Sequence, residues 1–300
     1  MTDASIVIPT FRHPLLLPHA LRSALAQEGV EVEVLVVGDG VEDDTRAALE
    51  PFLADSRVRF FDFEKGERHG ERHRDGVVRG ARGDVVCYLS DDDLLFPHHV
   101  AEMIELLQRV DFAYPPPVIA LPDGVLRYRP GDLSQPEFFA LIRAGRNNFV
   151  SLTGASHTRA AYARLPHGWR AAPPGKPTDI HMWEQFAALP GLSGAGGRRL
   201  TAIHFPDPDW SVVDQAARAA ELESWLGLYA SEGADGLDGL LAEAVLRAAQ
   251  EFKLRTIRLS DELDDARREI ARLSEPFWKR PARRVKRSAT RLRAGVRREV

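Results

Sequence analysis

Three consecutive aspartates, Asp91, Asp92 and Asp93, directly follow the apolar run at residues 85–89. An apolar run bounded by polar residues predicts a buried strand, and open α/β sheets bind ligands at the carboxyl ends of their strands. Crowded carboxylates repel one another once they lose hydration. A divalent cation compensates that repulsion, because Mg²⁺ and Mn²⁺ prefer carboxylate oxygens and bridge them to phosphates. The competing interpretation is a helix start, with Asp93 as the N-cap of the residues that follow.

The elements that position these aspartates can be predicted from the first third of the chain. Four β-rich apolar runs alternate there with helical patterns; they cover residues 5–8, 34–37, 58–61 and 85–89. This alternation predicts a parallel sheet covered by helices on both faces. The ligand crevice of such a sheet collects the residues that follow its strands. After the fourth run, His98 and His99 are expected on the solvent side of a helix.

A second carboxylate, Asp39, follows the second run and lies between Gly38 and Gly40. It is either a tight-turn residue or an acceptor for the imino N–H of a nucleobase in the crevice. The sequence contains no GxxxxGK[ST] loop, and no GxGxxG follows its first apolar run, so neither common glycine-rich phosphate loop is present. A diphosphate must then be neutralised in another way, and a metal ion held by Asp92 would do so.

Three segments in series resemble the family 2 glycosyltransferases of the GT-A fold. They are residues 5–12 (SIVIPTFR), 36–45 (VVGDGVEDDT) and 87–97 (CYLSDDDLLFP). The family typically has a strand ending in Pro-Thr-Tyr, a Val-Asp-Asp-Gly-Ser-x-Asp-x-Thr loop and an Asp-x-Asp-Asp-x-x-x-Pro loop. The resemblance covers roughly the first third of the chain. Gly38 and Ser90 depart from it, since aspartates are common at both positions.

The resemblance implies a nucleoside-diphosphate sugar donor, most simply a UDP-sugar, and Mn²⁺ or Mg²⁺ as cofactor. Carried over by position, Asp39 would bind the nucleobase, Asp91 would contact the ribose or the sugar, and Asp92 would ligate the metal. Three further residues would shape the nucleobase pocket: Pro9, Thr10 and Phe11. Arg74 matches the arginine of the family's Ala-Arg-Asn segment and would pair with donor phosphate or base; alternatively it belongs to a solvated basic face.

The acceptor half resembles the family less, and its best match is the segment PTDIHMW at residues 177–183. Asp179 aligns there with the general base of inverting members, which is needed because an acceptor hydroxyl must lose its proton as it attacks. The alternative role for Asp179 is the N-cap of the following helix. By resemblance, His204 would be a further metal or diphosphate contact, although a lone histidine can be purely structural, and residues 151–156 would line the acceptor cleft.

Charge is distributed unevenly along the chain. Residues 276–300 contain ten Lys or Arg and one acidic residue, a net +9, so the net −4 of the whole chain leaves −13 for residues 1–275. An acidic body argues against nucleic-acid binding. The basic tail, with Phe277 and Trp278 near its start, either docks on an anionic membrane surface or is simply solvated.

The C-terminal region also carries a heptad pattern. From Leu259 the apolar positions advance by 4, 3, 4, 3 and 4 residues, through Leu263, Ala266, Ile270 and Leu273 to Phe277. This is the spacing of coiled coils. It predicts either a homodimer through this helix or packing of the helix against its own domain.

The expected fold class is therefore α/β: a GT-A, mainly parallel sheet with helices on both faces, plus a C-terminal helical extension. Residues 1–110 would bind the donor and 111–210 the acceptor within one domain, followed by a helical extension at 211–275 and the basic tail at 276–300. The sequence has no basic n-region at its start, no apolar stretch of bilayer-spanning length and one cysteine, Cys87. We expect a cytoplasmic protein, which would be peripheral at the inner face of the cell membrane if the basic tail docks there.

The expected function is metal-dependent, inverting transfer of a sugar to a saccharide or lipid-linked acceptor in surface polysaccharide or glycoconjugate biosynthesis. Two alternatives stay open. A sugar-phosphate nucleotidylyltransferase has a related sheet but needs a glycine-rich loop with a following arginine after the first strand, which residues 9–12 do not supply. A catalytically silent scaffold that binds nucleotide or oligomerises gains slight support from Gly38 and Ser90.

Overall fold

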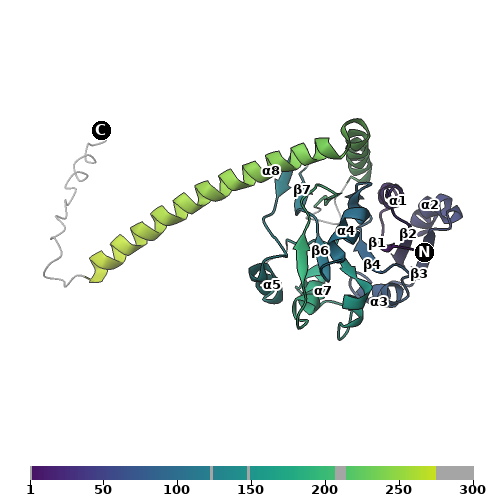
Figure 1. Ribbon diagram of the computed structural model, residues 1–300, viewed down its shortest axis with the longest axis horizontal. Helices are drawn as coiled ribbons and strands as arrows, with labels where there is room; N and C mark the ends of the chain where they lie inside the picture. Colours follow the sequence, from purple (N-terminus) through teal and green to yellow (C-terminus); the bar gives the residue numbers. More distant parts are fainter. Residues whose placement is uncertain (1, 122–123, 147–148, 207–213, 275–300) are drawn as a thin grey trace, which may run out of the picture. The chain divides into compact units, whose positions relative to one another are not determined.

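The computed structural model describes residues 2–121, 124–146, 149–206 and 214–274. The chain divides into two compact units, Met1–Ala249 and Gln250–Val300. The first unit contains the sheets and helices α1 to α7 (Figure 1). The second unit contains the end of the last helix, and the basic tail of residues 276–300 lies outside the described residues.

The central sheet of the first unit has seven strands in the order β10-β6-β9-β4-β1-β2-β3. Their bounds are β1 Ala4–Thr10, β2 Val32–Asp39, β3 Val58–Phe63, β4 Val85–Tyr88, β6 Phe112–Tyr114, β9 Ser156–Thr158 and β10 Gly194–Gly196. Strand β1 pairs in parallel with β2 and β4, whereas β9 is antiparallel to both of its neighbours. Two small sheets pair β5 (Leu94–Leu95) with β11 (Ala202–Ile203) and β7 (Val118–Ala120) with β8 (Leu126–Tyr128). The four predicted strands and the mainly parallel sheet are confirmed.

Eight α-helices accompany these strands in the described residues. They are α1 Leu17–Leu25, α2 Asp43–Leu49, α3 Glu71–Arg79, α4 His99–Leu107, α5 Pro136–Arg143, α6 Arg159–Ala163, α7 Thr178–Ala187 and α8 Gln215–Ser274, and a 3-10 helix, Glu50–Ala54, continues α2. The long C-terminal helix is thus confirmed. Helix α4 begins at His99, so Asp93 does not cap it, and the expectation of a helix cap there is wrong.

Both faces of the central sheet are buried. Because successive side chains of a strand point to opposite faces, Ile6 packs in a cluster with side chains of α1 and α4, while Val7 packs in the cluster that includes side chains of α3 and α7. Burial on both faces explains why the strands read as continuous apolar runs. His99 is fully buried and its Nδ1 lies 2.9 Å from Thr201 Oγ1, so the expected solvent position for it is wrong.

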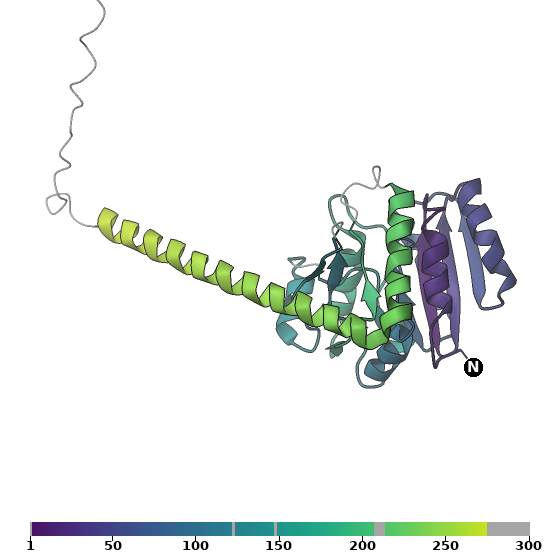
Figure 2. The same cartoon turned by 90° about the horizontal axis from the view of Figure 1, so that it is seen from above.

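A third apolar cluster lies beneath helix α8. Leu222 and Trp225 reach it from one part of the helix, and Leu237 and Leu241 from another. Between them Gly233 has φ 66° and ψ −165°, a backbone conformation open essentially to glycine alone. The break at this residue lets two helical segments pack on one cluster. Figure 2 shows α8 turning and its first segment beside α1, where His19 Nδ1 lies 3.2 Å from Glu223 Oε2.

No helix within the described residues is long and apolar enough to span a bilayer.

Candidate donor-binding site and reaction centre

A cavity of about 450 Å³ opens where strands β1, β2 and β4 end. Seven of the residues that the sequence singles out line it: Pro9, Thr10, Phe11, Asp39, Arg74, Asp91 and Asp92. Asp179 and His204 do not. The three motif loops therefore meet at one crevice, because the parallel strands that precede them deliver all three to the same edge of the sheet.

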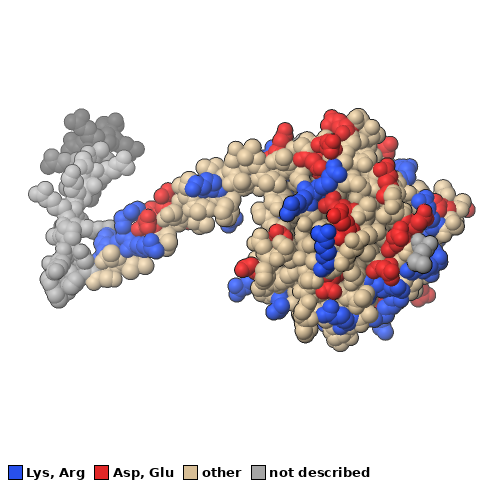
Figure 3. Space-filling view, in the orientation of Figure 1, with Lys and Arg blue, Asp and Glu red and all other residues tan. Residues whose placement is uncertain are grey.

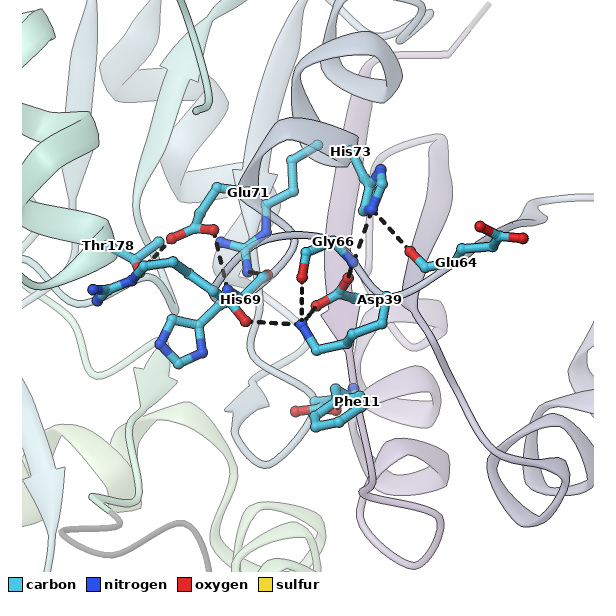
Figure 4. A network of polar contacts seen from close by, with 12 residues as sticks. Phe11, Asp39, Glu64, Gly66, His69, Glu71, His73 and Thr178 are labelled. Carbon is cyan, nitrogen blue, oxygen red and sulfur yellow. Dashed lines mark hydrogen bonds and ion pairs between the residues drawn. The ribbon is translucent and has the colours of Figure 1, made fainter. Parts of the chain in front are cut away.

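Asp39 is buried at the end of β2, and both of its carboxylate oxygens have partners. Oδ1 accepts a hydrogen bond from the Gly66 backbone N–H (2.6 Å) and lies 3.6 Å from His73 Nε2, and Oδ2 is 2.5 Å from Lys65 Nζ. Figure 4 shows this network around Asp39. A carboxylate oxygen has two acceptor positions, so this fixed and charge-compensated group can still accept a further N–H.

The backbone of the α3 N-terminus approaches Asp39 so closely that it excludes a side chain. Gly70 precedes α3 with φ +64°, and a Cβ placed there would lie 2.4 Å from Asp39 Cγ. Glycine is the residue that adopts positive φ without strain. The position of the Asp39 carboxylate therefore depends on a glycine far along the chain from the strand that carries it.

The acidic triplet divides into three environments. Asp91 accepts from the Phe11 backbone N–H (3.2 Å) and pairs with His13 Nδ1 (2.8 Å). Asp93 is fully buried and accepts from the Phe205 N–H (2.8 Å) and the Thr153 hydroxyl, with His204 Nδ1 2.9 Å away. Asp92 is only 9% exposed and has no hydrogen bond to any described residue. Asp93 is thus a structural anchor, and Asp92 is the carboxylate left for a ligand.

Electrostatics set Asp92 apart as well. Burial and the negative charges of Asp93 and Asp91 raise the pKa of Asp92 to about 8, against a weaker opposing effect of His13 and His204. Burial lowers the pKa of His204, but the combined effects of Asp93, Asp92 and Asp179 outweigh it and raise that pKa to about 8. The site therefore holds more negative charge than its own cations balance, which favours the binding of a cation.

The residues around Asp92 fit a divalent cation that binds together with substrate. No group of three or more His, Cys, Asp or Glu side chains in the described part of the chain is arranged as a complete metal cage. However, Mg²⁺ is commonly held by one or two carboxylates plus substrate phosphates, and Asp92 supplies one buried carboxylate that has no hydrogen bond to the described part of the chain. In His204, Nδ1 faces Asp93, the arrangement that orients metal-ligating histidines through their other nitrogen.

Arg74 is a buried cation at the cavity, only 6% exposed, so the interpretation as a solvated basic face is wrong. Its guanidinium lies 4.9 Å above the Trp169 ring, and Nη2 donates to the His69 carbonyl (2.9 Å). Burial lowers the pKa of Arg74, while the Glu71 carboxylate opposes that shift. A guanidinium held in this way is a natural partner for an anionic ligand.

Asp179 is the second residue of α7 and is close enough to His204 to influence it electrostatically. Its Oδ1 accepts from the Ile180 N–H (2.8 Å), and its charge adds to the rise in the pKa of His204. The N-cap of α7 is Pro177, so the N-cap interpretation of Asp179 is wrong. A hydrogen bond of 2.9 Å from the Thr178 hydroxyl to the buried Glu71 ties this end of α7 to α3, beside the donor cavity.

Sequence reasoning missed several residues of this site. Lys65 and His13 pair with Asp39 and Asp91, and His13 could have been found because it follows the first motif directly. Gln215, the first residue of α8, lines the cavity from the far end of the chain. Its Nε2 donates to the Arg12 carbonyl (2.8 Å), and Arg12 has the positive φ of 56°. No local pattern marks Gln215, since its position follows from tertiary packing.

With this geometry established, comparison with known proteins identifies the family. The family described as glycosyl transferase family 2 matches residues 5–165, more than half of the chain. The chain belongs to this family.

Two curated relatives each match about a third of the chain. The succinoglycan biosynthesis protein ExoO of Rhizobium meliloti is 36% identical over 103 residues, which is 34% of this chain and 29% of ExoO. The GalNAc(5)-diNAcBac-PP-undecaprenol beta-1,3-glucosyltransferase of Campylobacter jejuni is 26% identical over 106 residues, 35% of this chain and 34% of that enzyme. The aligned region thus spans about a third or less of these relatives.

Solved structures establish the fold class. S. aureus TarS 1–349 in complex with UDP-GlcNAc has a TM-score of 0.54 at 14% identity, covering 81% of this chain and 72% of that one. The complex of the same TarS fragment with UDP has a TM-score of 0.54 at 16% identity. The fold is GT-A-like: a mostly parallel, mixed sheet with helices and a long C-terminal helix, as the sequence predicts.

Proposed function

We propose that this chain transfers a sugar from a nucleoside-diphosphate sugar to an acceptor hydroxyl, with inversion at the anomeric carbon. The observation that carries the proposal is Asp92, a buried carboxylate to which no described residue donates a hydrogen bond, in a cavity that has the GT-A donor-site residues around it. UDP is the simplest donor nucleotide, since the similar TarS structures hold UDP and UDP-GlcNAc. Membership of glycosyl transferase family 2 supports the same reaction class.

Each residue has a role in this proposal. Asp39 accepts an imino N–H of the nucleobase above Phe11, Asp91 orients the ribose or sugar, and Arg74 pairs with the diphosphate. Asp92, with His204, would hold Mn²⁺ or Mg²⁺, and the bound ion would supply positive charge that stabilises the departing diphosphate. The positions of Asp39, Asp91, Asp92 and Arg74 in the lining of the cavity, and the contact of His204 with Asp93, support these assignments.

The chemical step needs one base. As the acceptor oxygen forms its bond to the anomeric carbon, Asp179 takes the hydroxyl proton, and the bond from that carbon to the diphosphate oxygen breaks. The nucleoside diphosphate leaves with the bonding electron pair. The electrostatic effect of Asp179 on His204 supports this role, because a base must lie close to the reacting centre.

The relatives suggest the acceptor class. One is named for succinoglycan biosynthesis and the other for an undecaprenol-linked saccharide. We therefore place this chain in the biosynthesis of a surface polysaccharide or glycoconjugate, acting on a saccharide or lipid-linked acceptor. The +9 net charge of residues 276–300 would dock the protein on an anionic membrane surface.

Titration calorimetry with UDP, GDP and dTDP, with and without Mn²⁺, tests the donor site. We expect one nucleotide to bind more tightly than the others, and EDTA to weaken that binding at least about tenfold, because the diphosphate then loses its counter-charge. A donor-hydrolysis assay on the same samples separates an enzyme from a silent scaffold. Failure of all three nucleotides to bind would contradict the proposal, and binding with no turnover of any donor sugar would favour the scaffold.

Co-sedimentation with anionic vesicles tests the membrane proposal. The full chain should bind vesicles rich in anionic lipid and a chain ending at residue 275 should not, since each basic residue near such a surface contributes about 1 kcal/mol. Neutral vesicles are the control. Equal binding of both chains at moderate salt would contradict the proposal that the basic tail docks on the membrane.

A further inference from the structure

The second unit exposes an unusual number of large apolar side chains. In the helical residues 250–274 they are between 46 and 69% exposed; they are Phe252, Leu254, Ile257, Leu259, Leu263, Ile270 and Leu273. The face of α8 visible in Figure 3 is mostly uncharged surface between a few charged side chains. Contiguous exposed apolar surface on a protein marks an interaction site.

Most of these side chains share one stripe. In a heptad written abcdefg, Leu259, Ala266 and Leu273 occupy d, and Leu263 and Ile270 occupy a. Phe252 at d and Thr256 at a extend this stripe toward the N-terminus of the helix. These a and d positions from Phe252 to Leu273 are here called the seam. A β-branched residue at a with leucine at d favours two strands, which is the combination of Ile270 and Leu273. Leu254 and Ile257 lie outside the seam, at f and b.

We propose that the seam pairs with the seam of a second copy of this chain, as a parallel, in-register, two-stranded coiled coil. This inference goes beyond the proposed transfer reaction, and its test needs no donor. The charges at positions e and g, beside the seam, favour a second copy as the partner and a parallel orientation. In a parallel pair, position g faces position e five residues further along the partner. Glu262 at g then faces the partner's Arg267, and the twofold symmetry makes this contact twice.

The remaining parallel contacts are free of repulsion. Arg255 and Glu269, the other charged g positions, face Ser260 and Ser274 of the partner. No like charges meet at the g and e positions of residues 253–274 in this arrangement. The helix itself is reinforced by i,i+3 ion pairs on its outer surface, such as Arg268–Asp265 (2.5 Å) and Arg272–Glu269 (2.5 Å).

An antiparallel pair would be worse. With Leu263 facing the partner's Leu259, position g faces g and e faces e, which brings Glu262 against the partner's Glu262. Lys253 would also face the partner's Arg267, and this second like-charge contact occurs twice. The favourable pairing of Arg255 with the partner's Glu269 occurs twice, against three like-charge contacts. Like charges at such positions are destabilising and set orientation.

Sedimentation velocity on the full chain, from about 1 to about 100 µM, measures the association. The wild type should shift from monomer toward dimer across this range. Leu263→Asp should raise the dimer Kd at least about 100-fold, because two uncompensated carboxylates would be buried against each other. Leu254→Asp is the matched control, with the same substitution on the same helix outside the seam, and should leave the Kd within about threefold.

Charge reversal and cross-linking test the orientation. Glu262→Lys and Arg267→Glu should each weaken the dimer about three- to tenfold, and the double variant should restore it, since the pair is remade with exchanged signs. Ala266→Cys should form an intermolecular disulfide under mild oxidation, because position 266 meets its own counterpart in the parallel pair, whereas in the antiparallel pair it would face the partner's Thr256. Leu254→Cys should not, and the native Cys87 is buried.

Three results would overturn the proposal. One is a wild-type chain that stays monomeric throughout the concentration range. Another is equal Kd values for Leu263→Asp and Leu254→Asp. The third is a failure of Ala266→Cys to cross-link while the chain is dimeric, which would indicate another orientation or another interface.

Discussion

The donor cavity and the C-terminal helix contain opposite kinds of unmet chemistry. In the cavity, Asp92 is an ionisable side chain that is 9% exposed and has no hydrogen bond among the described residues. On the helix, Ile270 is an apolar side chain that is 63% exposed. A folded chain ordinarily buries the second kind and solvates the first.

Both anomalies disappear when a partner is supplied, but the partners differ. A buried carboxylate without a donor calls for a cation and the anion that the cation brings. An exposed leucine seam calls for another apolar seam. The comparison teaches that the buried carboxylate lowers the stability of the folded chain itself. The exposed seam lowers that stability little, and its apolar surface contributes free energy only when a partner buries it. Four measurements can break or sharpen this contrast.

The largest effect is expected from Asp92→Asn. Sugar transfer should fall at least about 10³-fold, because the charge that holds the cation on the leaving diphosphate is lost. The free energy of unfolding should stay the same or increase, since the substitution removes a carboxyl group whose ionised form is unfavourable in this buried, acidic environment. Assays of turnover and urea unfolding on one preparation check both. Near wild-type turnover would remove the central assignment, and a large loss of stability would mean that Asp92 is structural.

Lowering the pH should destabilise the first unit, which contains the donor cavity, but not the helix of residues 250–274. Burial lowers the pKa of His157 to about 4 and that of His99 to about 3, so the folded chain excludes protons that the unfolded chain accepts. Stability is then present above the ordinary histidine pKa of 6.5 and is lost as the pH falls below it, by up to about 3 kcal/mol for His157. Residues 250–274 contain no histidine.

Urea unfolding at pH 7 and pH 4.5 measures this loss of stability in the first unit. Hydrogen exchange of the amides of residues 250–274 measures whether the helix changes between the same two pH values. His157→Gln should show a smaller difference between the two pH values than the wild type. The same pH dependence in both proteins would show that His157 is not the group that titrates.

Gly70→Ala should weaken donor binding about tenfold or more, because the new methyl group would displace the Asp39 carboxylate. Gly175→Ala is the matched control: it has a similar φ of +77° but nothing within 4 Å of the added carbon. Both substitutions should lower stability by about 1 kcal/mol through backbone strain, and calorimetry should find a change of nucleotide affinity only in the first. Equal affinities would mean that Asp39 does not contact the donor.

The smallest effect is expected where the apolar seam is changed. In dilute protein, Leu263→Asp should alter the free energy of unfolding of the first unit by less than about 0.5 kcal/mol, as is usual for exposed positions. Urea unfolding well below the dimer Kd measures it. A larger loss would show that the seam is already covered within one chain.

The sequence predicts the donor side well because its signals are local. Strands buried on both faces are apolar runs, and parallel strands bring their following loops together, so the loops after β1, β2 and β4 could be placed before the structure was known. Asp93 was assigned wrongly because its partner, His204, is 111 residues away. His99 was also misplaced, although its spacing of four from the buried Met103 was a usable signal. The roles of Asp39, Asp92 and Asp179 stay predictions.

Gln215 ties the beginning of α8 to the loop that follows β1, through the Arg12 carbonyl. Any ligand that holds that loop also holds the first turn of the helix, so occupancy of the cavity and local opening of α8 are thermodynamically linked. The amides just after Gln215 should then exchange more slowly when the cavity is filled. A probe placed there would report on a site formed mainly by the other end of the chain.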